Sequence, residues 1–255
     1  MQIREAKTNH PGQSLFLSTI FNVIGGWLYA LKYKVRITGG GPIPSTGPLF
    51  VLSKHWSLAD VPLGKIALTR MSGRHLWCVM KDSLARGPFG WFLLRQGGIP
   101  INRNNPEKSK ADLLLARSVL NEGNMLCLFP EQTTVRGKMG RGKTPGFRFI
   151  LGKPREPIAV LCVGFHYTRR RFRRTLVDFK IGTVRHFTRE HDPEMFMHEC
   201  MHEIADLSGL KYPYAPPLDR RARKAQKLND SSRPQRHSAA DEDAGTELAT
   251  NPANV

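Results

Sequence analysis

Cysteine is scarce in this sequence, and no two cysteines have the spacing of a metal or redox site. Cys78, Cys127, Cys162 and Cys200 stand singly in 255 residues. The lack of a C-x-x-C pair argues against a zinc site and against a thioredoxin-like motif. The first three lie within apolar runs, which predicts buried free thiols and a reducing compartment. We therefore expect no metal site.

Acidic residues are also few, with 21 Asp and Glu against 39 Lys and Arg and a formal net charge of +18. Such an excess predicts an anionic partner, which includes nucleic acid, an anionic membrane surface and phosphorylated substrates. The run Arg169–Arg174 predicts a cationic turn between strands that suits lipid headgroups or nucleic acid. Because no zinc-finger, helix-turn-helix or RNA-recognition pattern is present, we expect an anionic membrane surface and no nucleic acid.

Long hydrophobic runs are nearly absent, but Leu15–Leu31 is an uncharged and largely apolar stretch. It is shorter than the about 20 apolar residues of a typical spanning helix. Trp27 and Tyr29 lie near its end and Lys32 and Lys34 follow, as in segments that anchor at a membrane interface. The alternative is a helix buried in a soluble fold, and the cationic flank favours the anchor.

Composition divides the chain into three parts. Residues 1–34 form an N-terminal apolar membrane-associating segment, and residues 35–218 form the folded domain. Residues 219–255 contain almost no large apolar side chains, with seven Lys and Arg and six Asp and Glu. This composition predicts a disordered polar tail. The positive charge therefore belongs to the residues that precede the tail.

From residue 35 onward, predicted strands alternate with predicted helices. This alternation predicts an α/β fold, with a mixed, largely parallel central sheet flanked by helices. A long basic loop is expected over residues 130–145. The expected strands are 35–38, 49–53, 75–80, 98–102, 125–129, 158–165 and 176–181, and the expected helices are 60–71, 84–95, 107–121 and 192–207.

His55 and Asp60 follow the buried strand predicted over residues 49–53. A histidine held by a carboxylate is a common general base near neutral pH. A strand that ends just before His55 would place the imidazole at the rim of the sheet, where ligands bind in such folds. Taken alone, the H-x4-D pair is more often structural than catalytic.

Three further segments lie where predicted strands begin or end. They are 97–103, which ends in Arg103, 129–134, which contains Glu131, and 156–160. Neighbouring strand ends meet at one edge of a sheet. We therefore expect His55, Asp60, Arg103 and Glu131 to gather there.

These segments resemble the four ordered blocks of glycerolipid acyltransferases of the lysophosphatidic acid acyltransferase type. That family carries N-H-x-S-x-x-D, G-x-I-x-I-D-R, F-P-E-G-T-R and V-P-I-x-P-V. The corresponding segments here are 54–60, 97–103, 129–134 and 157–158. Lys81, with Leu84, Pro88 and Gly90 after it, is similar to the family's segment between the first two blocks. The resemblance spans residues 35–210.

The resemblance implies a role for each matching residue. His55 would be the general base, and Asp60 would orient it and stabilise the imidazolium. Arg103 would bind the acceptor phosphate, and Glu131 would organise the site or orient the acceptor. Ser57 and Lys81 would also contact substrate. The donor would be acyl-CoA or acyl-ACP with no bound cofactor, the acceptor 1-acylglycerol-3-phosphate or a related lysolipid, and the location the cytoplasmic face of a membrane.

The blocks also depart from the family pattern, and the departures concern the acceptor more than the chemistry. The positions that differ are Lys54, Asn102, Gln132, Thr134 and Val160. Thr134 replaces an arginine that helps to hold the acceptor phosphate in the family.

Basic residues that follow in the same loop, Arg136 above all, are expected to supply this charge, or else the acceptor is another lysolipid or an amino-acid lipid. Two rival functions stay open at this point. One is a catalytically decayed basic lipid-binding module, and the other is a hydrolase in which His55 activates water.

Overall fold

The structure is a computed structural model that describes residues 10–102, 105, 107 and 109–218. The chain divides into two units, Met1–Pro217 and Leu218–Val255. All the elements below belong to the first unit. Arg103 and the tail predicted over 219–255 lie outside the described residues.

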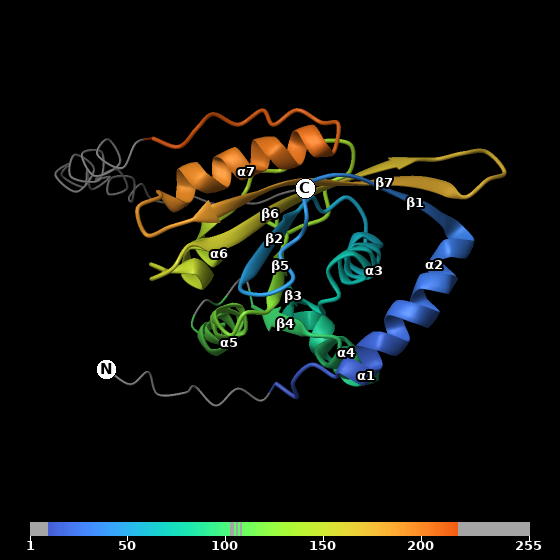
Figure 1. Cartoon of the computed structure of the whole chain (residues 1–255), viewed down its shortest axis with the longest axis horizontal. Helices are drawn as coiled ribbons and strands as arrows, with labels where there is room; N and C mark the ends of the chain where they lie inside the picture. The colour runs from blue at the N-terminus through green and yellow to red at the C-terminus, as the bar shows by residue number, and fades with distance from the viewer. Residues whose placement is uncertain (1–9, 103–104, 106, 108, 219–255) are drawn as a thin grey trace, which may run out of the picture. The chain divides into compact units, whose positions relative to one another are not determined.

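Seven strands of the described chain form one sheet in the order β1-β7-β6-β2-β5-β3-β4 (Figure 1). All neighbouring pairs are parallel except β6 and β7, which are antiparallel. The mixed, largely parallel sheet agrees with the prediction. The strands are β1 (Tyr33–Gly39), β2 (Leu49–Ser53), β3 (Leu76–Lys81), β4 (Gly98–Ile101), β5 (Met125–Leu128), β6 (Ile158–Thr168) and β7 (Thr175–Phe187).

Helices cover both faces of this sheet. The helical segments are α1 (Leu15–Ile20), the π-helical turn η1 (Phe21–Gly25), α2 (Gly26–Lys32), α3 (Asp60–Ser72), the 3-10 turn η2 (Asp82–Ala85), α4 (Gly87–Arg95), α5 (Lys110–Asn121), α6 (Thr144–Leu151) and α7 (Pro193–Leu207). Helices α5, α6 and α7 pack on the face that carries Phe50 and Leu52 of β2. Helix α3 packs on the opposite face, which carries Leu49 and Val51. Successive side chains of a strand point to opposite faces, so a strand covered on both sides is apolar throughout.

The structure differs from the sequence expectation at helix α6 and at the β6–β7 hairpin. Helix α6 begins inside the predicted loop 130–145, where Thr144 and Pro145 open a turn and Phe147, Ile150 and Leu151 bury one face. Strands β6 and β7 are longer than expected and form a hairpin, in which pairing continues to Thr168 and Leu176. Strand β2 pairs with β6 only as far as Val163, so the hairpin extends beyond its neighbour.

The cysteines are all free in the described chain, as three buried thiols and one that is half-buried. Cys127, Cys162 and Cys200 are buried, whereas Cys78 in β3 is half-buried because it lies near the sheet edge beside β4. The prediction of a buried thiol was therefore wrong for Cys78.

The N-terminal apolar segment is one continuous helix, Leu15–Lys32, with the π-helical turn at its centre. In the described chain it is the one helix that is long and apolar enough to cross a membrane. Only 17% of it is buried, and Phe16, Val23 and Trp27 are among its exposed side chains. A helix buried in a soluble core would show the opposite pattern.

Candidate active site

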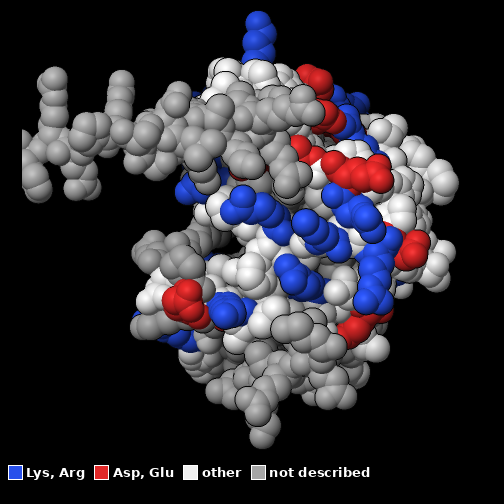
Figure 2. Space-filling model, turned by 90° about the vertical axis from the view of Figure 1, so that its left-hand side faces the viewer, with Lys and Arg blue, Asp and Glu red and all other residues white. Residues whose placement is uncertain are grey.

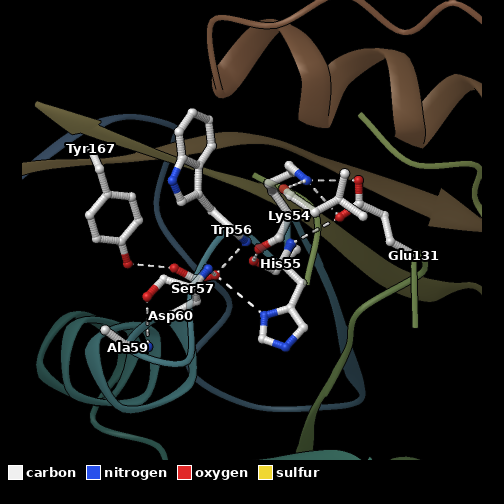
Figure 3. Close-up of polar contacts among 10 residues, drawn as sticks. Lys54, His55, Trp56, Ser57, Ala59, Asp60, Glu131 and Tyr167 are labelled. Carbon is white, nitrogen blue, oxygen red and sulfur yellow. Dashed lines mark hydrogen bonds and ion pairs between the residues drawn. The ribbon is translucent and has the colours of Figure 1, made fainter. Parts of the chain in front are cut away.

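His55 lies just beyond the carboxyl end of β2, in the turn that leads into α3 (Figure 3). The backbone N–H of Asp60 donates to the carbonyl of Ser57 at 3.0 Å, which closes the turn. Asp60 is the first residue of α3, where the helix dipole favours a negative charge. The local sequence thus folds the histidine and the carboxylate back toward each other.

The His55 and Asp60 side chains face each other in this turn. Nδ1 of His55 lies 3.4 Å from Oδ2 of Asp60, slightly longer than a typical hydrogen bond. The other ring nitrogen points away from the carboxylate (Figure 3). Such contacts are often long without substrate and tighten in the reacting complex. The pair can therefore place a proton on Nδ1 and leave the other nitrogen free to accept one.

Asp60 is held as a fixed, buried carboxylate by three donors. The backbone N–H groups of Trp56 and Ser57 each donate to Oδ2 at 2.6 Å, and the Tyr167 hydroxyl donates to Oδ1. Asp60 is 1% exposed, so these bonds replace water. Burial and the negative charge of Asp60 raise the pKa of Tyr167, which keeps the phenol protonated and donating.

Tyr167 is a site residue that the sequence did not indicate. It lies near the carboxyl end of β6, which is the neighbour of β2 in the sheet, and 107 positions along the chain from Asp60. Its only sequence signal is a position just past the end of a predicted strand at the site edge. That signal is shared with many residues that have no role.

Behind the histidine, Lys54 and Glu131 form a buried ion pair. Lys54 Nζ lies 2.8 Å from both carboxylate oxygens and donates to the carbonyl of Val135 at 2.6 Å. Burial lowers the pKa of Lys54, and the charge of Glu131 opposes this effect. Glu131 also accepts the backbone N–H groups of His55 at 3.3 Å and Gly140 at 2.6 Å. Two roles were expected for Glu131, to organise the site or to orient the acceptor, and these contacts correspond to the first.

This ion pair also ties the loop after β5 to the histidine turn. Val135 is clamped on both sides, since its N–H donates to the carbonyl of His55 at 2.9 Å while its carbonyl accepts from Lys54. The ring of His55 packs on Phe129 with 4.5 Å between centroids. The imidazole therefore rests on a rigid support built from two strand ends.

Ser57 and Arg136 line a common cavity of about 430 Å³ beside the histidine turn. Its other lining residues come from the turn and from the end of the apolar helix: Leu28, Tyr29, Lys32, Tyr33, Leu58 and Ala59. Lys81 is exposed at the end of β3 and does not line this cavity, because β5 separates β3 from β2. Arg103 cannot be placed, since it lies outside the described residues.

Gln132 adopts a left-handed backbone conformation, with φ of 57°, at the position where the resembling family has glycine. Its N–H closes a turn onto the carbonyl of Phe129 at 3.0 Å. A residue with a Cβ is disfavoured there. The backbone shape of the third block is thus kept although its glycine is not.

Within the described ranges, no group of three or more His, Cys, Asp or Glu side chains is placed to hold a metal ion. A buried carboxylate, an oriented imidazole and a neighbouring cationic cavity suit proton removal from an acceptor that carries an anionic group.

Comparison with known proteins identifies related sequences and folds. A family model described as Acyltransferase matches residues 34–189. A lyso-ornithine lipid O-acyltransferase of Rhodobacter capsulatus is 30% identical over 110 residues, which are 43% of this chain and 36% of that protein. The chain thus spans little more than a third of that relative's length.

A solved structure shows the same fold. It is the 1-acyl-sn-glycerophosphate acyltransferase PlsC of Thermotoga maritima, with a TM-score of 0.55, 20% identity, and coverage of 73% of this chain and 76% of that one. At this identity the likeness concerns the architecture alone, and it confirms the α/β prediction.

Proposed function

Because the chain belongs to the Acyltransferase family, we propose that it is an O-acyltransferase, which moves a fatty acyl group from a thioester donor to the hydroxyl of a lysolipid. The observation that carries the proposal is the His55–Asp60 pair, with the carboxylate fixed by two backbone N–H groups and Tyr167. Such a pair supplies general-base catalysis, which contributes about 10²–10⁴-fold to a rate.

In the proposed reaction the free ring nitrogen of His55 takes the proton of the acceptor hydroxyl. The oxygen then attacks the thioester carbonyl carbon, the C–S bond breaks, and the departing sulfur receives the proton from the imidazolium. Asp60 holds the proton on Nδ1 and stabilises the imidazolium while it exists. The acyl group passes directly to the acceptor, and the donor is acyl-CoA or acyl-ACP.

The cavity that holds Ser57 and Arg136 is the proposed acceptor site. Arg136 and Lys32 give it positive charge, while Leu28 and Leu58 offer apolar surface to an acyl chain. A guanidinium binds a carboxylate as well as a phosphate, through the same planar set of donors. With Thr134 in place of the family's arginine, and a curated relative named for lyso-ornithine lipid, we propose an amino-acid lysolipid as the preferred acceptor.

The exposed apolar helix Leu15–Lys32 supports membrane association, which would bring the protein to the bilayer in which a lysolipid acceptor resides. Its carboxyl end contributes Leu28, Tyr29 and Lys32 to the proposed acceptor cavity. A lysolipid would therefore reach His55 along the segment that rests on the membrane. We place the protein at the cytoplasmic face, where acyl thioesters are made available.

The test is an acceptor screen with full-length protein, labelled acyl-CoA and a panel of lysolipids. We expect lyso-ornithine lipid to be a better acceptor than lysophosphatidic acid, and His55→Ala to abolish turnover. His186→Ala is the matched control, because His186 is exposed on β7. Equal background in wild type and His55→Ala would instead favour a decayed lipid-binding module. Acyl release at a rate that no acceptor changes would favour a hydrolase.

The Arg136→Ala variant distinguishes acceptor binding from the chemical step. Loss of a charge-assisted hydrogen bond at this exposed position should raise the acceptor KM about tenfold in Arg136→Ala, with kcat little changed. Lys138→Ala removes a charge from the same loop at an exposed position outside the cavity lining and should leave KM as it is. An unchanged KM in Arg136→Ala would place the acceptor elsewhere.

A further inference from the structure

The β6–β7 hairpin extends beyond β2 and lies at the right of Figure 1. It ends in a basic tip with one exposed aromatic ring. We call residues Arg169–Arg174 the hairpin tip. Phe172 is 92% exposed, the highest value among the exposed large hydrophobic residues, and its φ is 56°. The five other residues of the tip are all arginines, and all five are exposed: Arg169, Arg170, Arg171, Arg173 and Arg174.

This combination suits a bilayer surface better than a partner that offers negative charge alone. Arginines near an anionic membrane bind its headgroups, and an aromatic ring among them can enter the interface. The guanidinium of Arg171 lies 5.1 Å from the centroid of the Phe172 ring, so charge and apolar surface form one unit. A purely electrostatic partner would use the arginines and leave the ring in water.

The position of the tip points to the same partner. Arg174 Nη1 donates to the carbonyl of Ala30, near the end of the exposed apolar helix, at 2.9 Å. Thr175, which follows the tip, pairs with Tyr33 at the start of β1. The hairpin tip and the carboxyl end of the apolar helix are therefore held side by side, and a membrane that receives one lies next to the other.

Positive charge alone does not single out this tip. Figure 2 shows Lys and Arg gathered on the end of the molecule that lies at the left of Figure 1, away from the hairpin. Arg148, Lys153 and Arg155 are exposed around α6 and before β6, at the opposite end of β6 from the tip. In that region Phe147, Ile150 and Leu151 are buried in the core. An exposed ring among the charges is what distinguishes the hairpin tip.

We propose that the hairpin tip is a second membrane contact, in which Phe172 enters the interface of an anionic bilayer and the arginines bind lipid phosphates. Together with the apolar helix, it would fix the rotation of the domain on the membrane. Because Tyr167, two residues before the tip, bonds to Asp60, the docked tip is linked directly to the histidine turn. The contact itself does not depend on the proposed acyl transfer.

Insertion of the tip is tested with an environment-sensitive fluorophore on Phe172→Cys of the full-length protein. Wild-type protein treated with the same fluorophore corrects for labelling of the half-buried Cys78. Arg155→Cys is the matched control at the other end of β6. With vesicles containing 30 mol % phosphatidylglycerol, we expect a blue shift at position 172 and none at 155. Co-flotation verifies that both proteins are bound. A label at 172 that stays in a water-like environment on bound protein would overturn the proposal.

The charge contribution is tested by lipid titration of two triple variants. Arg170→Gln, Arg171→Gln and Arg173→Gln together should weaken partitioning onto these vesicles on the order of 100-fold, about fivefold per arginine. The matched variant with Arg148→Gln, Lys153→Gln and Arg155→Gln should lose far less, and 0.5 M salt should reduce the difference.

Equal losses in the two variants would show that only total charge matters and would overturn the proposal. So would a label at 172 that responds to RNA and not to vesicles. Because these measurements report binding alone, failure of the acyltransferase assay leaves them valid, and the reverse holds too.

Discussion

Replacement of Tyr167 by phenylalanine removes one hydrogen bond from the Asp60 carboxylate and leaves the ring in place. The ring packs against Tyr33, Trp56 and Phe165, and these contacts need no hydroxyl. What is lost is the donor to Oδ1 of Asp60. The carboxylate then has one buried oxygen without its hydroxyl partner, while Oδ2 keeps both backbone donors.

The expected fall in kcat follows from the strength of this hydrogen bond. A hydrogen bond to a charged group contributes about 1.5–3 kcal/mol. Since two donors still hold Asp60, we take the low end, and a comparable loss in the transition state lowers kcat about tenfold. The acceptor KM should change little, because Tyr167 does not line the proposed acceptor cavity.

The assay compares kcat, acceptor KM and the free energy of unfolding for wild type, Tyr167→Phe and the control Tyr214→Phe. Tyr214 is half-buried beside Tyr212 and does not line the proposed acceptor cavity, so its hydroxyl should be dispensable. A purely structural hydroxyl would lower stability and leave kcat within twofold of wild type. That result would refute the view that Tyr167 positions Asp60 for the proposed reaction.

Three further predictions concern the support of the site and the core. Lys54→Ala leaves the Glu131 carboxylate buried without its cation and should lower the free energy of unfolding, measured with denaturant, by about 3–5 kcal/mol. The double variant with Lys54→Ala and Glu131→Gln should recover part of this stability. If it recovers none, the loss does not come from the unpaired charge of Glu131. Gln132→Gly should leave stability unchanged or raise it, whereas Gln132→Val should lower it by about 1–2 kcal/mol, because φ of 57° disfavours a β-branched side chain. Melting temperatures test this order, and a higher melting temperature for Gln132→Val than for Gln132→Gly would contradict it. Burial lowers the pKa of Lys65 from 10.5 to about 8, so between these values the unfolded state binds more protons and stability should rise with pH, by up to about 3 kcal/mol. Lys65→Met should abolish this rise when unfolding is measured at pH 7 and pH 10, and an unchanged slope would exclude Lys65 as its source.

The hydrophobic pattern predicted the elements near the site because the pattern is local. The buried run Leu49–Ser53 is β2 as expected, and the turn from His55 to Asp60 lies within one short stretch of chain. The helix expected from residue 60 begins at Asp60. Periodicity and motif spacing both act over a few residues, so one sequence suffices to find a strand, a helix and the pair between them.

The rest of the site depends on strand order, which the chain order does not reveal. Glu131 and Tyr167 approach the histidine turn because β5 and β6 are the neighbours of β2 in the sheet. Arg136 lines the cavity because the bond from Lys54 to the carbonyl of Val135 holds the preceding residue in place. The opposite wall of the cavity comes from the N-terminal helix.

The sequence by itself determined the α/β class, the pair of residues proposed to carry the chemistry and the apolar N-terminal helix, since each is written in adjacent or regularly spaced residues. Only the tertiary structure decided which tyrosine holds Asp60, that Lys54 is paired inside the protein, and that an arginine-rich hairpin lies beside the apolar helix. These contacts join residues 77 to 144 positions apart. Packing and burial select such partners, and no local pattern encodes them.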